Sequence, residues 1–351
     1  MQRAWLGRGW LATALWPLSL AVAAVVASRH WLQRRCGLRS QALPVPLIVV
    51  GNLIVGGAGK TPTVLALAAL LRRHGYTPGV VSRGYGRTSS VVREVAPHDD
   101  PAQTGDEPLL LRIRGRVPVV VGRRRADAAR LLLRRHPEVD VVVSDDGLQH
   151  RQLHRDLELI DFDERGAGNG WLLPAGPLRE PLSAAATSSG RVRRWVLYNA
   201  DRETTPLAGS LIARSLGGPV ELADWWRGAS APASDWRCLS GKPLIAAAGI
   251  ARPERFFGML RALGLRLTPL PLADHDRWRR MPWPATTPDA IVSEKDAVKL
   301  RPGATGATRV WVAPLDFRLD AVIERELLAA LAEAAARIAA RSGPQHLPED
   351  H

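Results

Sequence analysis

The chain has 351 residues, enough for two domains, and 48 basic against 34 acidic residues give a formal net charge of +14. Only four of the basic residues are lysines, namely Lys60, Lys242, Lys295 and Lys299. The excess charge favours an anionic partner such as a membrane surface, a phospholipid or a nucleotide. No basic run is interleaved with aromatic residues, so we expect no nucleic-acid binding. The two cysteines exclude a disulfide framework, which fits the cytoplasm.

The N-terminal segment predicts a membrane anchor over residues 1–35. Residues 11–27 form an uncharged, mostly apolar run that would span about 25 Å as a helix, slightly less than a bilayer core. Arginines flank the run on both sides and four tryptophans lie in or beside it, as at membrane interfaces. A cleaved signal peptide and a buried helix of a soluble domain are the alternatives. The pattern fits a helix that crosses the bilayer and one that only embeds in it.

The segment 46–63 contains the most informative motif. An apolar run of strand type, 46–50, is followed by the glycine-rich turn 56–59, then by Lys60 and Thr61 at the start of an apolar helical pattern. Backbone N–H groups of such a turn cradle phosphates, the lysine reaches the outer phosphates, and the threonine hydroxyl holds Mg²⁺. Ile54 stands where the usual eight-residue pattern has glycine, so the segment predicts a variant phosphate-binding loop (P-loop). The alternative is a glycine turn that merely joins strand to helix.

Two further strand ends carry charged residues. The apolar strand 139–143 is followed by Asp145 and Asp146, as in a Walker B element whose carboxylate holds Mg²⁺ directly or through water. Adjacent aspartates are also common turn formers. The loop 82–87 places two glycines between Arg83 and Arg87 at the end of another strand, a suitable place for phosphate, although a surface turn is the alternative. Parallel strands bring their carboxyl ends together, so these loops and the P-loop are expected to converge.

Other segments are open to two interpretations. Asp106 and Glu107 precede a helix, where an N-cap and a first-turn acid would explain both without any function. The Gly/Pro-rich loop 169–180 is of a length that is more often functional than filler. His275 follows the strand 265–272 beside an aspartate, which fits either a proton carrier or a structural histidine.

Alternating strands and helices predict an α/β fold with two α/β/α domains. We expect four parts: an N-terminal anchor helix (1–35), a P-loop kinase domain (36–205), a smaller α/β domain (206–342) and a flexible tail (343–351).

Together these segments resemble the tetraacyldisaccharide 4'-kinases, the lipid A 4'-kinases of Gram-negative bacteria. The resemblance covers nearly the whole chain, and eight motifs occur in the family's order: VPLIVVGN with GGAGKTP, VSRGYGR, GDEP, SDDGLQH, NGWLLPAGPLRE, AAGIARPERFF, PLADH and SEKDAVK. It implies two α/β/α domains around a cleft, the larger one P-loop-like. It also implies transfer of phosphate from ATP, with Mg²⁺, to the 4'-hydroxyl of an acylated, 1-phosphorylated glucosamine disaccharide at the cytoplasmic face of the inner membrane. No obligate protein partner is evident.

The resemblance also assigns residues. The residues implied to cradle ATP are Val55, Gly56, Gly57, Ala58, Gly59, Lys60 and Thr61. Those implied to hold Mg²⁺ are Thr61, Asp145, Asp146 and Glu180, with Gln149 nearby. Asp106 and His275, from different domains, are implied to act with Lys60 in catalysis and to meet only when the cleft closes. Arg83 is implied to grip phosphate, and Arg87 and Lys295 are further candidates.

Two other functions fit parts of the sequence. A membrane-bound P-loop GTPase switch needs a guanine-reading Asn-Lys-x-Asp motif, and the nearest match, 199–201, lacks the lysine. A non-catalytic, ATP-dependent membrane adaptor gives no role to Asp106, His275 or the second domain. Acyl-chain preference, oligomeric state, the carboxylate that ligates Mg²⁺ and the residue that takes the proton are left open.

Overall fold

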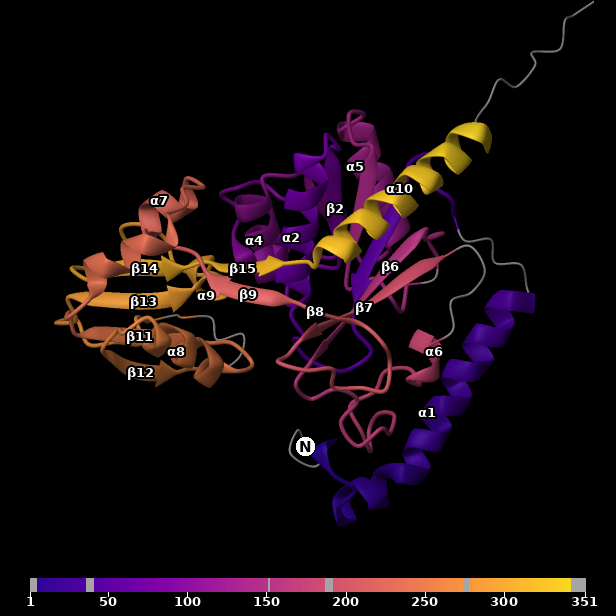
Figure 1. The fold of residues 1–351 in the computed structure, drawn as a ribbon, viewed down its shortest axis with the longest axis horizontal. Coiled ribbons are helices and arrows are strands. Elements are labelled where there is room, and N and C mark those ends of the chain that lie inside the picture. The colour runs from indigo at the N-terminus through magenta and orange to yellow at the C-terminus, as the bar shows by residue number, and fades with distance from the viewer. Residues whose placement is uncertain are drawn as a thin grey trace, which may run out of the picture.

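The chain forms two lobes, each built on its own β-sheet (Figure 1). The computed structural model describes residues 5–35, 41–150, 152–186, 192–273, 278 and 280–341. The larger lobe carries an eight-stranded sheet and the smaller lobe a five-stranded sheet. This architecture confirms the predicted α/β fold.

The larger sheet is parallel apart from one edge strand. Its order is β3-β4-β2-β5-β1-β6-β7-β8, and only β3 runs antiparallel to its neighbour. The strands are β1 (Leu47–Gly51), β2 (Pro78–Ser82), β3 (Arg93–Glu94), β4 (Val119–Val121), β5 (Val141–Asp145), β6 (Leu157–Asp163), β7 (Arg193–Asn199) and β8 (Ser210–Leu211). The central strands β2, β5, β1 and β6 are buried along their whole length, as expected of a sheet covered on both faces.

Helices cover both faces of this sheet. On one face lie α2 (Lys60–Arg73), α4 (Asp106–Gly115) and α10 (Ala321–Arg341), which share a core with alternate residues of the strands. On the other face lies α5 (Arg125–Arg135), packed on β2 and β4. The short helices α3 (Pro101–Thr104) and α6 (Ser183–Ala186) lie in connecting loops.

The smaller sheet has the order β10-β14-β13-β11-β12, with only β10 antiparallel. Its strands are β10 (Val220–Glu221), β11 (Leu244–Ala248), β12 (Leu267–Pro271), β13 (Asp289–Ser293) and β14 (Arg309–Ala313). Helix α8 (Pro253–Ala262) covers one face of this sheet. Helices α7 (Leu222–Trp226) and α9 (Glu294–Ala297) contribute to the core on the other face. The 3-10 helix η2 (Ala233–Leu239) packs with α8.

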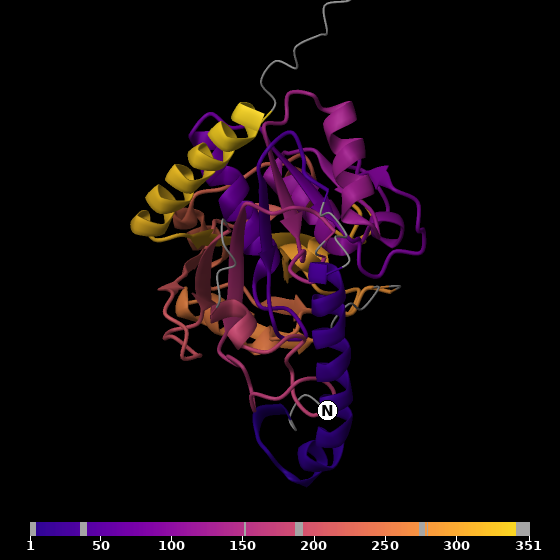
Figure 2. The ribbon, with the colours of Figure 1, turned by 90° about the vertical axis from the view of Figure 1, so that its right-hand side faces the viewer.

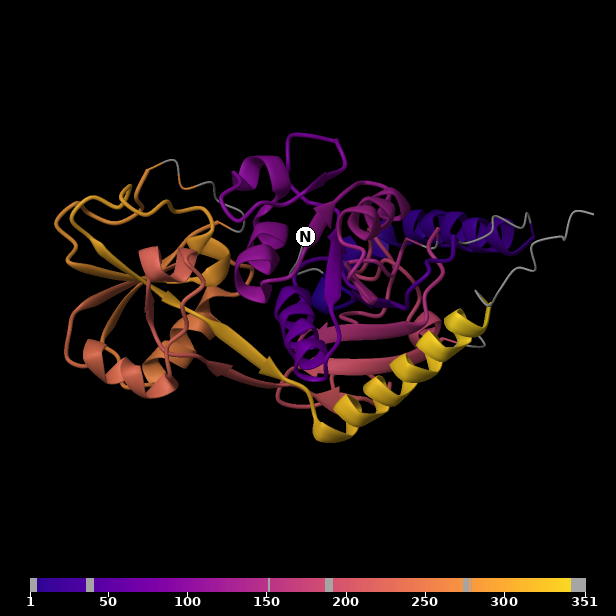
Figure 3. The same cartoon turned by 90° about the horizontal axis from the view of Figure 1, so that it is seen from above.

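The chain crosses between the lobes twice. Strands β9 (Ala213–Leu216) and β15 (Leu315–Arg318) pair antiparallel and form the connection seen in Figure 3. After β15 the chain returns to the larger lobe, where α10 lies across the large sheet (Figure 1). The Trp195 indole donates to the Glu326 carboxylate of α10 at 2.9 Å. Residues 321–341, which we expected within the smaller domain, thus pack on the larger lobe.

The N-terminal helix α1 (Trp10–Arg35) runs along the outside of the larger lobe (Figure 2). Its stretch Trp10–Ser28 is long and apolar enough to cross a membrane, and only 11% of the stretch is buried. Large apolar side chains along α1 are exposed, among them Trp10, Trp16 and Leu20. The tail 343–351 lies outside the described residues.

Candidate functional site

The P-loop has the strand–turn–helix geometry that its sequence predicts. β1 ends at Gly51, and α2 begins at Lys60. Gly59, the residue before the helix, has φ of 100°, and no side chain of the described residues caps the helix. The first N–H groups of α2 are therefore available to an anion. The Lys60 ammonium donates to the Asn52 side-chain oxygen at 3.2 Å, and the Asn52 amide donates to the Gly56 carbonyl at 3.0 Å.

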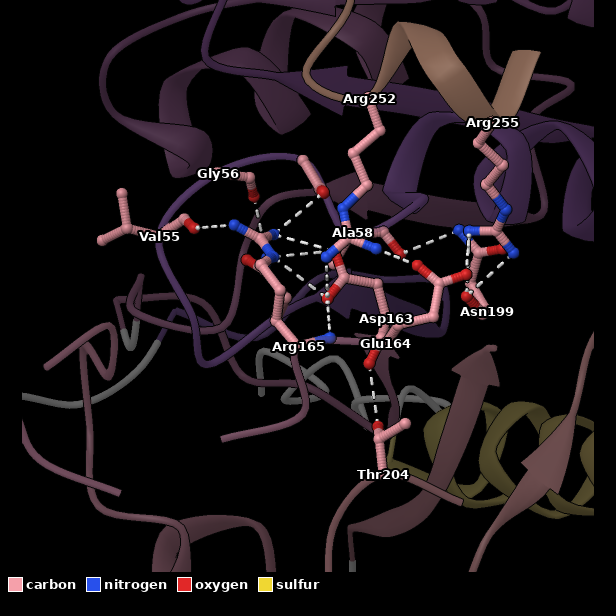
Figure 4. A network of polar contacts seen from close by, with 12 residues as sticks. Val55, Gly56, Ala58, Asp163, Glu164, Arg165, Asn199, Thr204, Arg252 and Arg255 are labelled. Carbon is pink, nitrogen blue, oxygen red and sulfur yellow. Dashed lines mark hydrogen bonds and ion pairs between the residues drawn. The ribbon is translucent and has the colours of Figure 1, made fainter. Parts of the chain in front are cut away.

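A residue outside the motif fixes the shape of this loop. The Arg165 guanidinium donates to the carbonyl oxygens of Val55 and Gly57, each at 3.1 Å (Figure 4). The same guanidinium is held by the Asp163 carboxylate at 2.9 Å. Asp163 is the last residue of β6, the strand next to β1. The contact holds the carbonyl oxygens of Val55 and Gly57 toward Arg165.

Asp145 ends β5 beside the P-loop and is buried, with 1% of its surface exposed. One carboxylate oxygen accepts from the Ser82 hydroxyl at 2.8 Å, whereas the other, Oδ1, has no hydrogen-bond partner among the described residues. Burial raises the pKa of Asp145 to about 7, and the charges of Glu107 and Asp146 act in the same direction. A buried carboxylate oxygen without a partner is costly unless a cation or proton occupies it.

Asp146 connects the acidic turn to two cations. Its carboxylate lies 3.7 Å from the Lys60 ammonium and 3.2 Å from the Arg179 guanidinium. Although burial acts in the opposite direction, these two charges lower the pKa of Asp146. Arg179 also donates to Gln149 at 3.4 Å, and the adjacent Glu180 is 6% exposed. The P-loop, the acidic turn and the end of the loop 169–180 therefore meet at one point.

A buried arginine holds the acidic turn in place. Arg125, at the start of α5 and 2% exposed, donates to the carbonyl oxygens of Asp145 at 3.1 Å and Asp146 at 3.4 Å. Burial lowers the pKa of Arg125 to about 10. The charge of Arg83 contributes in the same direction and also lowers the pKa of His150. Arg83 is exposed, so its charge faces the edge of the site.

Asp106 lies at the first turn of α4, where the smaller lobe approaches the larger one. The Lys299 ammonium lies 4.0 Å from the Asp106 carboxylate, and the Lys295 ammonium lies 3.6 Å from Glu107. Lys299 also contacts Asp296 at 3.1 Å. His275 lies outside the described residues, so its meeting with Asp106 stays a prediction.

A cavity of about 220 Å³ opens between the lobes beside the P-loop. Gly57, Gly59, Lys60 and Thr61 line it from the larger lobe, and residues of α8, α9 and β15 line it from the smaller lobe. The Glu164 carboxylate, on the larger lobe, contacts the Arg252 guanidinium and lies 2.9 Å from the Arg255 guanidinium, both on the smaller lobe (Figure 4).

Sequence reasoning identified the P-loop and the acidic turn but missed several residues around them. Arg125, Asp163, Arg165 and Lys299 were not singled out for a role in the site. Only Lys299 carried a signal, as one of four lysines in an arginine-rich chain.

The donor set fits Mg²⁺ bound together with phosphate. Among the described residues, no group of three or more His, Cys, Asp and Glu side chains is arranged to hold an ion by itself. Mg²⁺ usually takes only one or two carboxylates and completes its shell with phosphate oxygens and water. The unpartnered Oδ1 of Asp145 and the Thr61 hydroxyl at the start of α2 suit that mode.

Comparison with known proteins finds a protein family whose model matches most of the chain. The family model described as Tetraacyldisaccharide-1-P 4'-kinase matches residues 11–332. The chain belongs to this family. The tetraacyldisaccharide 4'-kinase of Methylibium petroleiphilum is 54% identical over 337 residues, which cover 93% of this chain and 92% of that protein. The enzyme of the same name from Leptothrix cholodnii is 52% identical over 339 residues, 94% of this chain and 95% of that protein.

A solved structure agrees with the family assignment. The crystal structure of Aquifex aeolicus LpxK in complex with ATP is 26% identical, covers 92% of this chain and 99% of that chain, and superposes with a TM-score of 0.77. The predicted resemblance and fold are thereby confirmed. The chain is an ATP-dependent kinase of lipid A biosynthesis.

Proposed function

We propose that this kinase binds ATP with its phosphates at the N-terminus of α2, cradled by residues 55–61. Support comes from the uncapped start of the helix and from Lys60, whose ammonium is 3.2 Å from Asn52 and 3.7 Å from Asp146. These two contacts hold the ammonium at the mouth of the loop, where it would meet the outer phosphates. The exposed Arg83 would add a second cation to a phosphate at the rim.

We propose that Thr61, Asp145, Asp146 and Glu180 hold Mg²⁺ with the nucleotide, directly or through water. The observation that carries this proposal is the buried Oδ1 of Asp145, which lacks a hydrogen-bond partner among the described residues. The ion would neutralise charge that develops on the transferred phosphoryl group. Because burial favours the neutral form of Asp145, its ionised form would be recovered when the cation binds.

We propose that Asp106 accepts the proton of the acceptor hydroxyl with the help of His275. Support comes from the position of Asp106 at the start of α4, next to Glu107, which lines the cavity with Lys60. A sugar hydroxyl is a weak acid, so a carboxylate that accepts its proton helps modestly and fixes the acceptor. His275 would join this pair when the lobes close.

We propose that the acceptor is the 4'-hydroxyl of a membrane-bound tetraacyldisaccharide 1-phosphate and that the enzyme works at the cytoplasmic face of the inner membrane. The acceptor follows from the family and from its relatives' names. The membrane location is supported by α1, whose apolar side chains are exposed along Trp10–Ser28. Arginines on both sides of this stretch suit an anionic lipid surface.

The test is transfer of ³²P from γ-labelled ATP to tetraacyldisaccharide 1-phosphate in detergent micelles. We expect transfer by the wild type, loss of on the order of a hundredfold or more in Lys60→Ala and Asp106→Ala, and normal transfer in Lys242→Ala, which changes a lysine outside the site. Transfer by Asp106→Ala at the wild-type rate would refute the role of Asp106. A change in the metal requirement of Asp145→Asn, followed as the Mn²⁺/Mg²⁺ activity ratio, tests the metal site separately.

A further inference from the structure

The N-terminal helix is joined to the phosphate site by a continuous run of contacts through residues 169–180, here called the bridging loop. Along most of its length α1 is exposed, but its residue Ser19 is only 4% exposed. The Ser19 hydroxyl donates to the Leu172 carbonyl at 2.8 Å and accepts from the Ala175 N–H at 3.0 Å. A polar residue in an apolar helix thus satisfies two backbone groups of the bridging loop.

Contacts near the start of the chain reinforce this junction. The Trp5 indole donates to the Pro174 carbonyl at 2.9 Å, and the Asn169 amide donates to the Gly7 carbonyl at 3.1 Å. The Arg8 guanidinium lies 5.1 Å from the centre of the Trp171 ring. A helix that served only to hold the protein at a membrane would need none of these contacts.

The other end of the bridging loop lies in the proposed ATP and Mg²⁺ site. The Val55 N–H, in the P-loop, donates to the Pro177 carbonyl at 2.9 Å, and the Arg179 N–H donates to the Leu53 carbonyl at 2.7 Å. The Arg179 side chain then contacts Asp146. Within the bridging loop, ten residues or fewer therefore separate the contacts with the N-terminal segment from Pro177 and Arg179, which contact the P-loop and the acidic turn.

We propose that α1 is a positioning element of the active site as well as a membrane anchor, and that Ser19 is its positioning residue, acting through the bridging loop on Arg179 and the P-loop. This inference rests on the proposed ATP site. Seating of α1 would fix the bridging loop, and a lipid surface that holds α1 would thereby favour the productive form of the site. The lipid acceptor and the catalytic groups would be brought together by one element.

The experiment compares Ser19→Ala with Ser28→Ala in the full-length protein. Ser28 is the matched control, because it lies on the same helix and, among the described residues, its hydroxyl bonds only to the Val25 carbonyl of that helix. Each variant is assayed with a short-chain, water-soluble analogue of the acceptor, which needs no membrane recruitment. Binding to vesicles of anionic phospholipid and thermal unfolding are measured in parallel.

We expect Ser19→Ala to lose kcat on the order of tenfold with the soluble acceptor, since the buried Ala175 N–H loses its partner and the Leu172 carbonyl keeps only the Gly176 N–H among the described residues. Its binding to vesicles should equal that of the wild type, and Ser28→Ala should match the wild type in both assays. Equal kcat for Ser19→Ala and Ser28→Ala would overturn the proposal and leave α1 an anchor only. A wild type that transfers no phosphate would instead refute the proposed function.

A double-mutant cycle with Arg179→Gln tests the route. If Ser19 acts through Arg179, its loss should cost much less activity in the Arg179→Gln background than in the wild type. Equal losses in both backgrounds would contradict coupling through the Arg179 side chain. Should Ser19→Ala fold poorly, Trp171→Leu provides a second variant, because it removes a bridging-loop ring that packs against Trp16 of α1. We expect the same loss of kcat without loss of vesicle binding.

Discussion

Asp163, the last residue of β6, forms an ion pair with Arg165, and the Arg165 guanidinium also binds the backbone of the P-loop. The Arg165–Asp163 distance is 2.9 Å, and Arg165 reaches the carbonyl oxygens of Val55 and Gly57 at 3.1 Å each. A glycine-rich loop is costly to order because glycine loses much conformational freedom. The Arg165 guanidinium, which is oriented by the Asp163 carboxylate, donates hydrogen bonds that offset this cost before the nucleotide binds.

We therefore predict that Arg165→Gln weakens ATP binding. The KM for ATP should rise on the order of ten- to a hundredfold, as expected when charge-assisted hydrogen bonds worth about 1.5–3 kcal/mol are lost. Steady-state kinetics with ATP varied measures the effect, and Arg202→Gln, at an exposed arginine, is the control. An unchanged KM for ATP would show that the loop keeps its shape without the clamp.

Gly59 is predicted to tolerate no side chain. Its φ of 100° is strained for other residues, and a Cβ would lie 2.7 Å from the Asn199 amide and 3.1 Å from the Phe317 ring. Gly59→Ala should cost about 1–3 kcal/mol of stability and abolish most ATP binding. The control is Gly258→Ala, at an exposed glycine outside the P-loop where no atom of the described residues lies within 4 Å of a Cβ. Equilibrium binding of a fluorescent ATP analogue and thermal unfolding would measure both effects, and equal behaviour of the two variants would contradict the prediction.

The buried carboxyls give a pH dependence of stability with a definite sign. Burial raises the pKa values of both Asp145 and Asp161 to about 7. The folded protein therefore binds more protons than the unfolded chain between about pH 4 and 7, so the stabilisation is full below pH 4 and is lost as pH rises through 7. Ionisation of these two groups should therefore lower the Tm of the nucleotide-free protein as the pH rises through this window.

The Tm of Asp145→Asn and of Asp161→Asn, measured from pH 5 to 8, should fall less steeply with pH than that of the wild type. Asp140→Asn is the control, because Asp140 is an exposed aspartate whose carboxylate bonds the Thr77 N–H. Curves for Asp145→Asn and Asp161→Asn that run parallel to those of the wild type and Asp140→Asn would refute the assignment of raised pKa values to Asp145 and Asp161. Added Mg²⁺ and ATP should flatten the wild-type curve, because the cation would stabilise the ionised form of Asp145.

The sequence was sufficient for the parts of the site that are local in the chain. The P-loop and the acidic turn each follow a short apolar strand, and glycine, lysine and aspartate at those spacings carry a specific chemistry. β6 was missed. Its residues 157–163 alternate carboxylates with apolar side chains, yet all of them are buried. Its carboxylate Glu158 is paired with Arg155 at 2.9 Å and with Arg194, and the latter partner is distant in the chain.

Long-range contacts explain the other misses. Arg165 binds residues about 110 positions earlier, and Arg125 binds the turn 20 positions later, so neither role has a local pattern. The return of α10 to the larger sheet was not predicted either. That return depends on the path of β15, which no local signal fixes.

Lys299 lies between two carboxylates, those of Asp296 and Asp106. The Lys299 side chain is 4% exposed and lies 3.1 Å from Asp296, whose side chain is fully buried, and 4.0 Å from Asp106. Asp296 also accepts from the Gly249 N–H at 3.0 Å and the Ser293 hydroxyl at 2.6 Å, so three groups contact its carboxylate. Removing the lysine leaves a buried carboxylate with only neutral donors.

Lys299→Met should therefore destabilise the protein by about 3–5 kcal/mol, as when one partner of a buried ion pair is removed. Lys242→Met, which changes a lysine outside this cluster, should be close to the wild type in urea unfolding. The double variant Asp296→Asn/Lys299→Met should regain part of the loss, because no unpaired charge is left. Failure of the double variant to regain stability would mean that packing of the lysine stem, and not its charge, supports this side of the cleft.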